Sequence, residues 1–425
     1  MPRRLSQPLV LLLMAVLLEA VFLVLRGLHP LDAHVAELVA TALAGGLLYL
    51  VAAWRMLTWR HSTRAALAVV LFAAVVFRLT LLPLPPTLSD DAYRYVWEGE
   101  VQLAGYNPYL IAPADPELVP LRPAEFDRLP GKDIPSAYPP LTQLLFRLAA
   151  WLDGLATFKL LSVLFDLATL LLIVGVLRLR GQPPVRALLY GWCPLVVLEF
   201  AGSGHNDSLA LCALLLAHWL IIRGRPAVSI VALAAAALSK WFAGVLAPVF
   251  LRRTRWWGTP LFAATAAVLS LPYLGAGSNL LSGFATYAEK WRNNESLYAL
   301  LMAATGQESI ATGVALGVVG GLALHCALRR VEPLRAGFLL LAAVLLLAPS
   351  VFPWYVTWLV PFLCFFPNPA LLLFTVTVLL SYHVLIDYRA LGVWHYSPAL
   401  VWLEYLPVYA LLLWSWWRRQ RPPAA

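Results

Sequence analysis

The chain has 425 residues, of which 61% are hydrophobic and only 12% are charged, and its mean hydropathy is +0.77. Soluble globular domains carry about twice that charged fraction, so the composition excludes an ordinary soluble protein. The net charge of +9 alone would suit a nucleic-acid-binding protein, but the basic residues cluster in short connectors between apolar segments. We therefore expect membrane lipids, and no nucleic acid, around this chain.

Apolar segments that approach or reach the ~20 residues of a membrane-spanning helix recur along the whole chain. Their number predicts an all-α polytopic membrane protein, a bundle of about 12–14 transmembrane helices in one domain of residues 1–425. In chain order, the expected helices lie near residues 8–25, 35–54, 65–82, 157–177, 187–200, 208–222, 226–251 (two arms), 259–274, 309–328, 336–349, 354–366, 370–386 and 399–417.

Two segments depart from this simple pattern. Residues 226–251 are bounded by basic clusters at both ends, so we expect them to enter the membrane and return, with Ser239 and Lys240 at the turn. Each arm then spans only roughly 20 Å of helix, which predicts an outer cavity recessed into the membrane. The segment 141–152 is too short to span and is expected to be a juxtamembrane or re-entrant helix.

Short arginine-rich connectors predict the orientation. Seven of them hold 19 of the 31 Lys and Arg residues and include one acidic residue, Glu332. The positive-inside rule places these connectors in the cytoplasm. The long loop of residues 83–140 has nine acidic and four basic residues and is therefore expected on the opposite side. The connectors contain Arg3/Arg4, Arg55/Arg60/Arg64, Arg178/Arg180/Arg186, Arg223/Arg225, Arg252/Arg253/Arg255, Arg329/Arg330/Arg335 and Arg418/Arg419/Arg421.

The polar motifs fall on this non-cytoplasmic side, and loops are where functional residues concentrate. A carboxylate at Asp90 or Asp91 can act as general base for a hydroxyl nucleophile, although Ser-Asp-Asp also suits a helix N-terminus. His205 and Asp207, in a turn between two helices, suit either a substrate or phosphate contact or a plain polar turn. Their spacing without further ligands is weak evidence for a metal, so no metal site is expected.

Charged residues within or near apolar segments form a second group of candidates. The charge of Lys240 is energetically costly in an apolar segment, so this residue marks a functional site by default. A bound phosphate would stabilise the charge; alternatively, the side chain extends to the membrane interface. Arg292 lies in a polar outer stretch and would line the same anionic pocket or be solvated. The charged residues of the expected spans should pair inside the bundle for structural reasons; they are Arg78, Asp166, Glu199 and Glu404.

Several motifs occur together between residues 65 and 365. They are SDDAYRYVWEG from Ser89, GYNPY from Gly105, YPP from Tyr138, GHND from Gly204 and PWY from Pro353. In this order they resemble the motifs of GT-C-fold, polyprenyl-phosphate-mannose-dependent mannosyltransferases, in particular the bacterial α-1,6-mannosyltransferases. The catalytic subunit of GPI mannosyltransferase I has a related but more distant loop.

This resemblance implies a GT-C-type helix bundle whose large first outer loop carries juxtamembrane helices and a catalytic aspartate. Matching the pattern S-x-D-x-Y-x-Y places that aspartate at Asp91, whereas the D-x-D-Y form would favour Asp90; we prefer Asp91. The chain departs from the family in one respect, because residues 1–60 supply two extra N-terminal helices whose role is open.

The activity that the resemblance implies is transfer of a sugar, with inversion, from a polyprenyl-phosphate donor to a glycan or glycolipid acceptor. In this family the sugar is mannose. Asp91 would deprotonate the acceptor, while Lys240 and His205, with Arg292 behind them, would stabilise the departing phosphate. No cofactor is expected, and the site should face the periplasm from a multi-pass protein of the cell membrane. The remaining candidates for substrate binding are Tyr93, Arg94, Tyr138, Asp207 and Tyr355.

Two alternatives are kept open. A lipid or glycan flippase would need polar residues along a path through the membrane, whereas here they gather on one side. A GT-C relative that transfers another group, such as aminoarabinose or another pentose or hexose, would use the same scaffold, because a fold does not specify the sugar.

Overall fold

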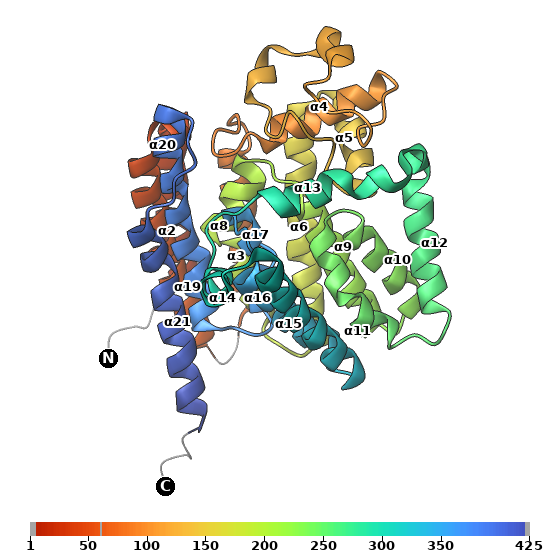
Figure 1. Cartoon of the computed structure of the whole chain (residues 1–425). Helices are drawn as coiled ribbons and strands as arrows, with labels where there is room; N and C mark the ends of the chain where they lie inside the picture. Colours follow the sequence, from red (N-terminus) through yellow and green to blue (C-terminus); the bar gives the residue numbers. More distant parts are fainter. Residues whose placement is uncertain (1–5, 60–61, 421–425) are drawn as a thin grey trace, which may run out of the picture.

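The computed structural model describes residues 6–59 and 62–420, and within these ranges every regular element is a helix (Figure 1). The predicted all-α membrane architecture is confirmed. Four arginines of the predicted basic connectors, Arg3, Arg4, Arg60 and Arg421, lie outside the described residues.

Eight helices in the described ranges are long and apolar enough to cross a membrane. A ninth span results if residues 184–191 and 194–202, which meet at a bend of 61°, count as one. This is fewer than the 12–14 crossings expected, and the difference falls mainly on four apolar helices of 10–17 residues. These shorter helices are Asp207–Ile222, Pro226–Ala237, Trp241–Leu251 and Pro333–Leu347.

The N-terminal helices pack together before the chain reaches the long outer loop. The Tyr49 hydroxyl donates a hydrogen bond of 2.7 Å to the carbonyl of Leu189, which fixes this part to the centre of the bundle. Leu31 donates from its backbone to the Thr87 hydroxyl over 3.0 Å, so the turn between the first two helices touches the start of the outer loop. The elements are α1 (Gln7–Gly27), η1 (Leu31–Ala33), α2 (Val35–Leu57) and α3 (Arg64–Leu81).

The outer loop folds into short helices that lie at one end of the molecule (Figure 1). The expected juxtamembrane helix of residues 141–152 is present as α5, and α4 and α5 pack against each other. Gly99 allows this close approach, because a Cβ there would lie 2.3 Å from the carbonyl oxygen of Phe146. The elements are α4 (Asp91–Leu103), η2 (Pro116–Leu121), η3 (Ala124–Arg128), α5 (Pro140–Leu152) and α6 (Leu155–Leu179).

Residues 226–251 form the predicted hairpin, with Lys240 at its turn. The turn is attached to the outer loop: the amide of Leu141 donates to the carbonyl of Leu238 over 2.9 Å, and the Thr142 hydroxyl donates to the carbonyl of Ser239 over 2.6 Å. Lys240 is therefore placed beside the end of that loop. The elements are η4 (Pro184–Ala187), α7 (Leu188–Gly191), α8 (Pro194–Val197), the π-helical η5 (Leu198–Gly202), α9 (Asp207–Ile222), α10 (Pro226–Ala237), η6 (Trp241–Leu246) and α11 (Ala247–Leu251).

The C-terminal part contains one correction to the expected helices. Residues 354–366 were expected to form one helix but form two short ones, and Pro361 stands at the start of the second, where its missing amide hydrogen costs no helical hydrogen bond. The elements are α12 (Gly258–Ser270), η7 (Leu271–Leu281), α13 (Ser282–Lys290), α14 (Leu297–Thr305), α15 (Glu308–Leu328), α16 (Pro333–Leu347), α17 (Pro353–Val356), α18 (Val360–Leu363), α19 (Pro369–Thr377), η8 (Val378–His383), α20 (Val384–Leu391) and α21 (Pro398–Gln420).

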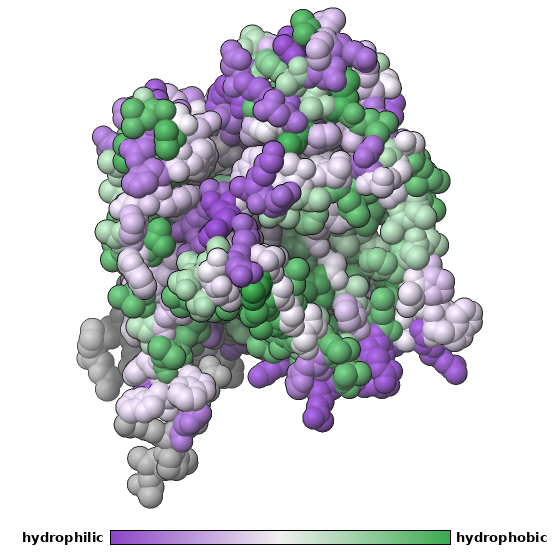
Figure 2. Space-filling model, viewed as in Figure 1, coloured by the Kyte–Doolittle hydropathy of each residue, from purple (hydrophilic) through white to green (hydrophobic). Residues whose placement is uncertain are grey.

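The described basic connectors lie at the end of the molecule opposite the outer loop (Figure 1). Arg180 forms an ion pair with Glu332 of another connector. Arg253 donates to the carbonyls of Arg330 and Val331 over 3.0 and 2.7 Å. Figure 2 shows hydrophilic side chains at both ends of the molecule and a more hydrophobic surface between them, as expected for a chain surrounded by lipid.

The predicted charge pairing within the bundle is present for Arg78 and Asp166. Arg78 of α3 and Asp166 of α6 are fully buried and form a bidentate ion pair, with distances of 2.5 and 3.2 Å. Arg78 also donates to the carbonyls of Ala74 and Gly191. Glu199 accepts a hydrogen bond from the Tyr382 hydroxyl, and Glu404 accepts one of 2.9 Å from Asn294. These groups stabilise the bundle from inside rather than facing lipid.

Candidate active site

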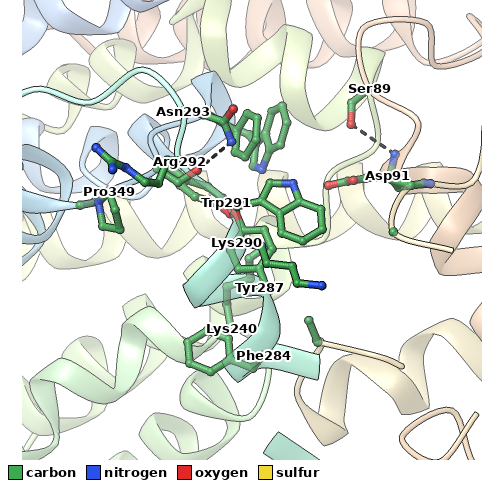
Figure 3. Close-up of a pocket in the computed structure, with 18 of the residues that line it drawn as sticks. Ser89, Asp91, Lys240, Phe284, Tyr287, Lys290, Trp291, Arg292, Asn293 and Pro349 are labelled. Atoms are coloured by element: carbon green, nitrogen blue, oxygen red, sulfur yellow. Dashed lines mark hydrogen bonds between the residues drawn. The ribbon is translucent and has the colours of Figure 1, made fainter. Parts of the chain in front are cut away.

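A cavity of about 1250 Å³ opens beside the outer loop. Its walls come from the outer loop, the Lys240 turn, the end of α13 and the stretches before α14 and α17. Figure 3 shows Asp91 on one side of this cavity and Arg292 and Asn293 on the other. Residues from motifs that are far apart in the chain, among them Asp91, Tyr138 and Tyr355, therefore converge on one space, whereas the GHND and GYNPY motifs do not line it.

Asp91 is the carboxylate best placed to act on a molecule in this cavity. It is the first residue of α4, and its amide donates to the Ser89 hydroxyl over 3.2 Å, so the local Ser-Asp-Asp turn sets its position. Its side chain is 23% exposed and accepts a hydrogen bond of 3.3 Å from the Tyr95 hydroxyl. Burial raises the pKa of Asp91 to about 6, and the positive charge of Lys240 opposes this rise.

Asp90 lines the same cavity but is already engaged. Arg128 lies 2.7 Å from its carboxylate, and the same guanidinium stacks over the Tyr93 ring at 4.2 Å and donates to the Tyr93 hydroxyl over 2.8 Å. Tyr93 itself does not line the cavity. A carboxylate held by a guanidinium is a poorer proton acceptor than one that is not, so the two aspartates are not equivalent.

His205 lies behind Asp91 and does not line the cavity. It is 1% exposed, and its ring stacks on Trp354 at 4.0 Å. Its Nδ1 atom is 3.8 Å from the Asp91 carboxylate and its Nε2 atom 3.4 Å from that of Glu199. The expectation that His205 touches a substrate phosphate is therefore not supported by its position. It can instead support Asp91 from the protein side.

Lys240 lines the cavity with its charge already compensated. Its ammonium group donates to Asp207 over 3.1 Å and to Asn206 over 3.0 Å. Asp207 is fully buried, does not line the cavity and accepts a further hydrogen bond of 2.6 Å from the Trp358 indole. The GHND turn thus anchors Lys240, and Asp207 is its counter-ion rather than a group exposed to substrate.

The other predicted residues divide between cavity wall and scaffold. Tyr138 and Tyr355 line the cavity, and the Tyr355 hydroxyl is 2.7 Å from that of Tyr287. Arg94 also borders the cavity, but it is 4% exposed, pairs with Glu98 over 2.6 Å and donates to carbonyls of the outer loop, so it holds the loop. Arg292 is ion-paired with Glu295 over 2.5 Å at the edge of the cavity.

One cation of the cavity stands apart from the rest. Six Lys and Arg side chains line it, and five of them have a carboxylate partner: Arg94, Arg128, Lys240, Arg292 and Arg389. For the sixth, Lys290 at the end of α13, the described residues supply no such partner. An uncompensated ammonium group in a cavity wall is the natural contact for an anionic ligand group.

Several residues of the site were not identified from the sequence. Tyr95, Arg128 and Trp358 contact Asp91, Asp90 and Asp207, from positions 4, 38 and 151 residues away. Only the Tyr95 contact could have been read from helical spacing, since i and i+4 side chains meet on one face. Among the described residues, no group of three His, Cys, Asp or Glu side chains is arranged to hold a metal ion.

Comparison with known proteins gives one match. A family model described as alpha-(1->6)-mannopyranosyltransferase, N-terminal domain, matches residues 11–255. The matched range contains Asp91, the GHND turn and Lys240, as well as the first two helices. No curated protein and no solved structure matches the chain.

Proposed function

Because this chain belongs to the alpha-(1->6)-mannopyranosyltransferase family, we propose that it transfers mannose from a polyprenyl-phosphate-linked donor to a glycan or glycolipid acceptor, with inversion, on the extracytoplasmic side of the cell membrane. The observation that supports this most directly is that one cavity is lined by both Asp91 and Lys290, a lysine with no carboxylate partner among the described residues. A base and a phosphate contact are the two functions that such a transfer requires.

In this reaction, the acceptor hydroxyl loses its proton to Asp91 as its oxygen forms a bond to the anomeric carbon. The bond from that carbon to the phosphate oxygen breaks on the opposite face, and the polyprenyl phosphate leaves with the electron pair. Asp91 is suited to this role because a pKa of about 6 lies close to neutral pH while leaving the carboxylate ionised there. His205 and Tyr95 would hold the carboxylate in position.

An apolar part of the cavity would hold the polyprenyl chain. It is lined by side chains of α15 and α16, and several residues of α15 are exposed on the lipid-facing surface, among them Leu316 and Val318. A prenyl chain in this part of the cavity would pass directly into the bilayer, whose lipid tails would shield the rest of it from water. An enclosed pocket is therefore not needed to bury it. The lining residues are Ala315, Leu316, Val319, Val344, Leu345 and Leu347.

Lys290 would meet the donor phosphate. The sequence favoured Lys240 and His205 for this role, but Asp207 compensates the first and the second is buried behind Asp91. Negative charge grows on the phosphate as it departs, so a cation that has no carboxylate partner gains most in the transition state. Lys240 would then stabilise the ionised form of the neighbouring Asp91 through its positive charge and help to orient the substrate.

Replacing Lys290 by glutamine is expected to lower kcat/KM for the donor about 100-fold, because the departing phosphate loses a charged donor. The matched control is Arg292→Gln, which removes a neighbouring cation that is already paired with Glu295. Initial rates with purified protein over a range of donor concentrations measure both. Equal losses in the two variants would contradict a specific role for Lys290.

The rate should also depend on pH through Asp91. The base is active when deprotonated, so kcat/KM is expected to fall about tenfold for each pH unit below about 6 and to level off above it. With an aspartate of unperturbed pKa, kcat/KM would begin to fall only at about pH 4. Initial rates between pH 4.5 and 8 test the prediction, and rates that stay nearly level down to pH 4.5 would show that burial does not govern this carboxylate.

The proposed function is tested by incubating the purified protein with radiolabelled polyprenyl-phospho-mannose and a mannose-containing acceptor, and then analysing the product. A new glycosidic bond supports transfer, and its anomeric configuration tests inversion. Movement of the lipid-sugar across proteoliposomes without a new bond would instead indicate a flippase. If the protein turned over only a different lipid-linked sugar, the proposed transferase activity would stand and the proposed donor would be wrong. Cysteine labelling of an Asp153→Cys variant, in the exposed turn between α5 and α6, would test the orientation.

A further inference from the structure

A polar and aromatic cluster, which we call the rim cluster, forms a second part of the cavity wall. Its members come from three segments far apart in the sequence: the turn between α1 and α2, the outer loop, and the α20 region. In Figure 1 these segments lie toward the outer-loop end of the molecule, whereas α15 runs toward the opposite end. The rim cluster consists of Asp32, Asp90, Arg128, Tyr388, Arg389 and Trp394, all of which line the cavity.

The charges of the rim cluster compensate one another. Arg128 pairs with Asp90 over 2.7 Å, and Arg389 pairs with Asp32 over 3.6 Å. The two pairs are close to each other, since the negative charge of Asp32 contributes to raising the pKa of Asp90, after the larger effect of burial. This part of the wall offers many hydrogen-bond donors and acceptors without a net charge. It therefore favours a neutral polar ligand over an anionic one.

Aromatic rings extend from the rim cluster toward Asp91. Trp394 and Tyr388 are 44% and 39% exposed and lie 5.0 Å apart. Trp394 contacts Phe352 at 6.2 Å, Phe352 stacks on Trp354 at 4.5 Å, and Trp354 stacks on His205 behind Asp91. Aromatic faces carry partial negative charge and attract the polarised C–H groups on one face of a sugar ring. Rings beside paired carboxylates and guanidinium groups suit a carbohydrate.

From this placement we infer that the rim cluster is the binding site for the neutral glycan end of the acceptor, and that the turn between the two N-terminal helices helps to build it. The inference rests on the proposed function and adds the location and charge of the acceptor. The acceptor reaches Asp91 from the outer-loop end, while the lipid donor lies against Lys290 and the apolar residues of α15 and α16. The first two helices thereby gain a role through Asp32 in the turn between them.

The test uses the full-length protein, polyprenyl-phospho-mannose as donor and a synthetic octyl mannobioside as neutral acceptor. Trp394→Ala is expected to raise KM for the acceptor about tenfold, the effect of one lost aromatic contact, with KM for the donor and slow donor hydrolysis by water unchanged. Trp394→Phe should stay close to the wild type, because it keeps an aromatic face. The matched control is Trp402→Ala on α21, an exposed tryptophan outside the cavity wall.

Asp32→Asn provides an independent arm, because it leaves Arg389 without its partner and gives the rim cluster a positive charge. We expect a higher KM for the neutral acceptor and, again, an unchanged KM for the donor. An unchanged acceptor KM in both variants, or a parallel rise for donor and acceptor, would overturn the inference while leaving the transferase itself intact. A wild-type protein that forms no glycosidic bond would contradict the proposed function first and remove the acceptor site with it.

Discussion

Replacing Asp91 by asparagine is expected to lower kcat about 1,000-fold, within the range that a positioned general base contributes. The asparagine side chain has the same shape, so the hydrogen bond with Tyr95 and the fold should remain, but it cannot accept the proton of the acceptor hydroxyl. Single-turnover transfer from polyprenyl-phospho-mannose measures the loss. Donor binding should change little, because the proposed contact of the phosphate is Lys290 rather than this carboxylate.

The matched control is Asp90→Asn at the adjacent residue. Its carboxylate is held by Arg128, so its loss should disturb the outer loop and reduce the rate by less than about tenfold, the share of a partly exposed ion pair. Near-normal turnover in Asp91→Asn would remove Asp91 as the base. If the large loss instead occurred in Asp90→Asn, the alternative motif alignment would be the correct one.

Replacing Arg78 by alanine is expected to destabilise the protein by about 3–5 kcal/mol, the cost of leaving a buried charge without its partner. Asp166 is 0% exposed and receives both hydrogen bonds of its ion pair from Arg78. Thermal unfolding in a mild detergent, followed by intrinsic fluorescence, compares the variant with the wild type.

The double variant Arg78→Met and Asp166→Leu distinguishes an unpaired charge from lost packing. It removes both charges and keeps most of the side-chain volume, so it should recover much of the stability lost in Arg78→Ala. A double variant as unstable as the single one would show that the carbonyls of Ala74 and Gly191, which Arg78 also binds, need the guanidinium as much as Asp166 does. Arg64→Ala, at the exposed start of α3, serves as a surface control.

Local patterns in the sequence predicted those features that depend on near neighbours. The basic ends of residues 226–251 identified the hairpin with Lys240 at its turn, and the length of residues 141–152 identified α5 as a helix too short to span. The Ser-Asp-Asp turn placed Asp91 at the start of α4. Helix count was predicted less well, because an apolar helix of 10–17 residues has the same composition whether it crosses the bilayer or only enters it.

The roles of the charged residues depended on partners that the sequence does not reveal. Lys240 and His205 both belong to the outer motifs, yet Asp207 compensates the one and Trp354 covers the other. Arg128 lies in a loop whose net charge is negative, and nothing local indicates that it holds Asp90. Lys290 differs from its neighbours only in lacking a carboxylate partner among the described residues, which is a property of the folded arrangement.

By itself, then, the amino-acid order was sufficient for the lipid-embedded class, the all-helical bundle, the separation of basic and acidic loops and the family, because hydropathy, charge and short motifs act over a few helical turns. Only the tertiary structure decided which cavity cation lacks a carboxylate partner within residues 6–59 and 62–420, which aspartate is held by an arginine, and that the N-terminal turn reaches the cavity. The physical reason is that charge compensation and burial are settled between side chains within about 4 Å, and the pairs Lys240–Asp207, Arg128–Asp90 and Arg389–Asp32 join segments that are far apart in the sequence.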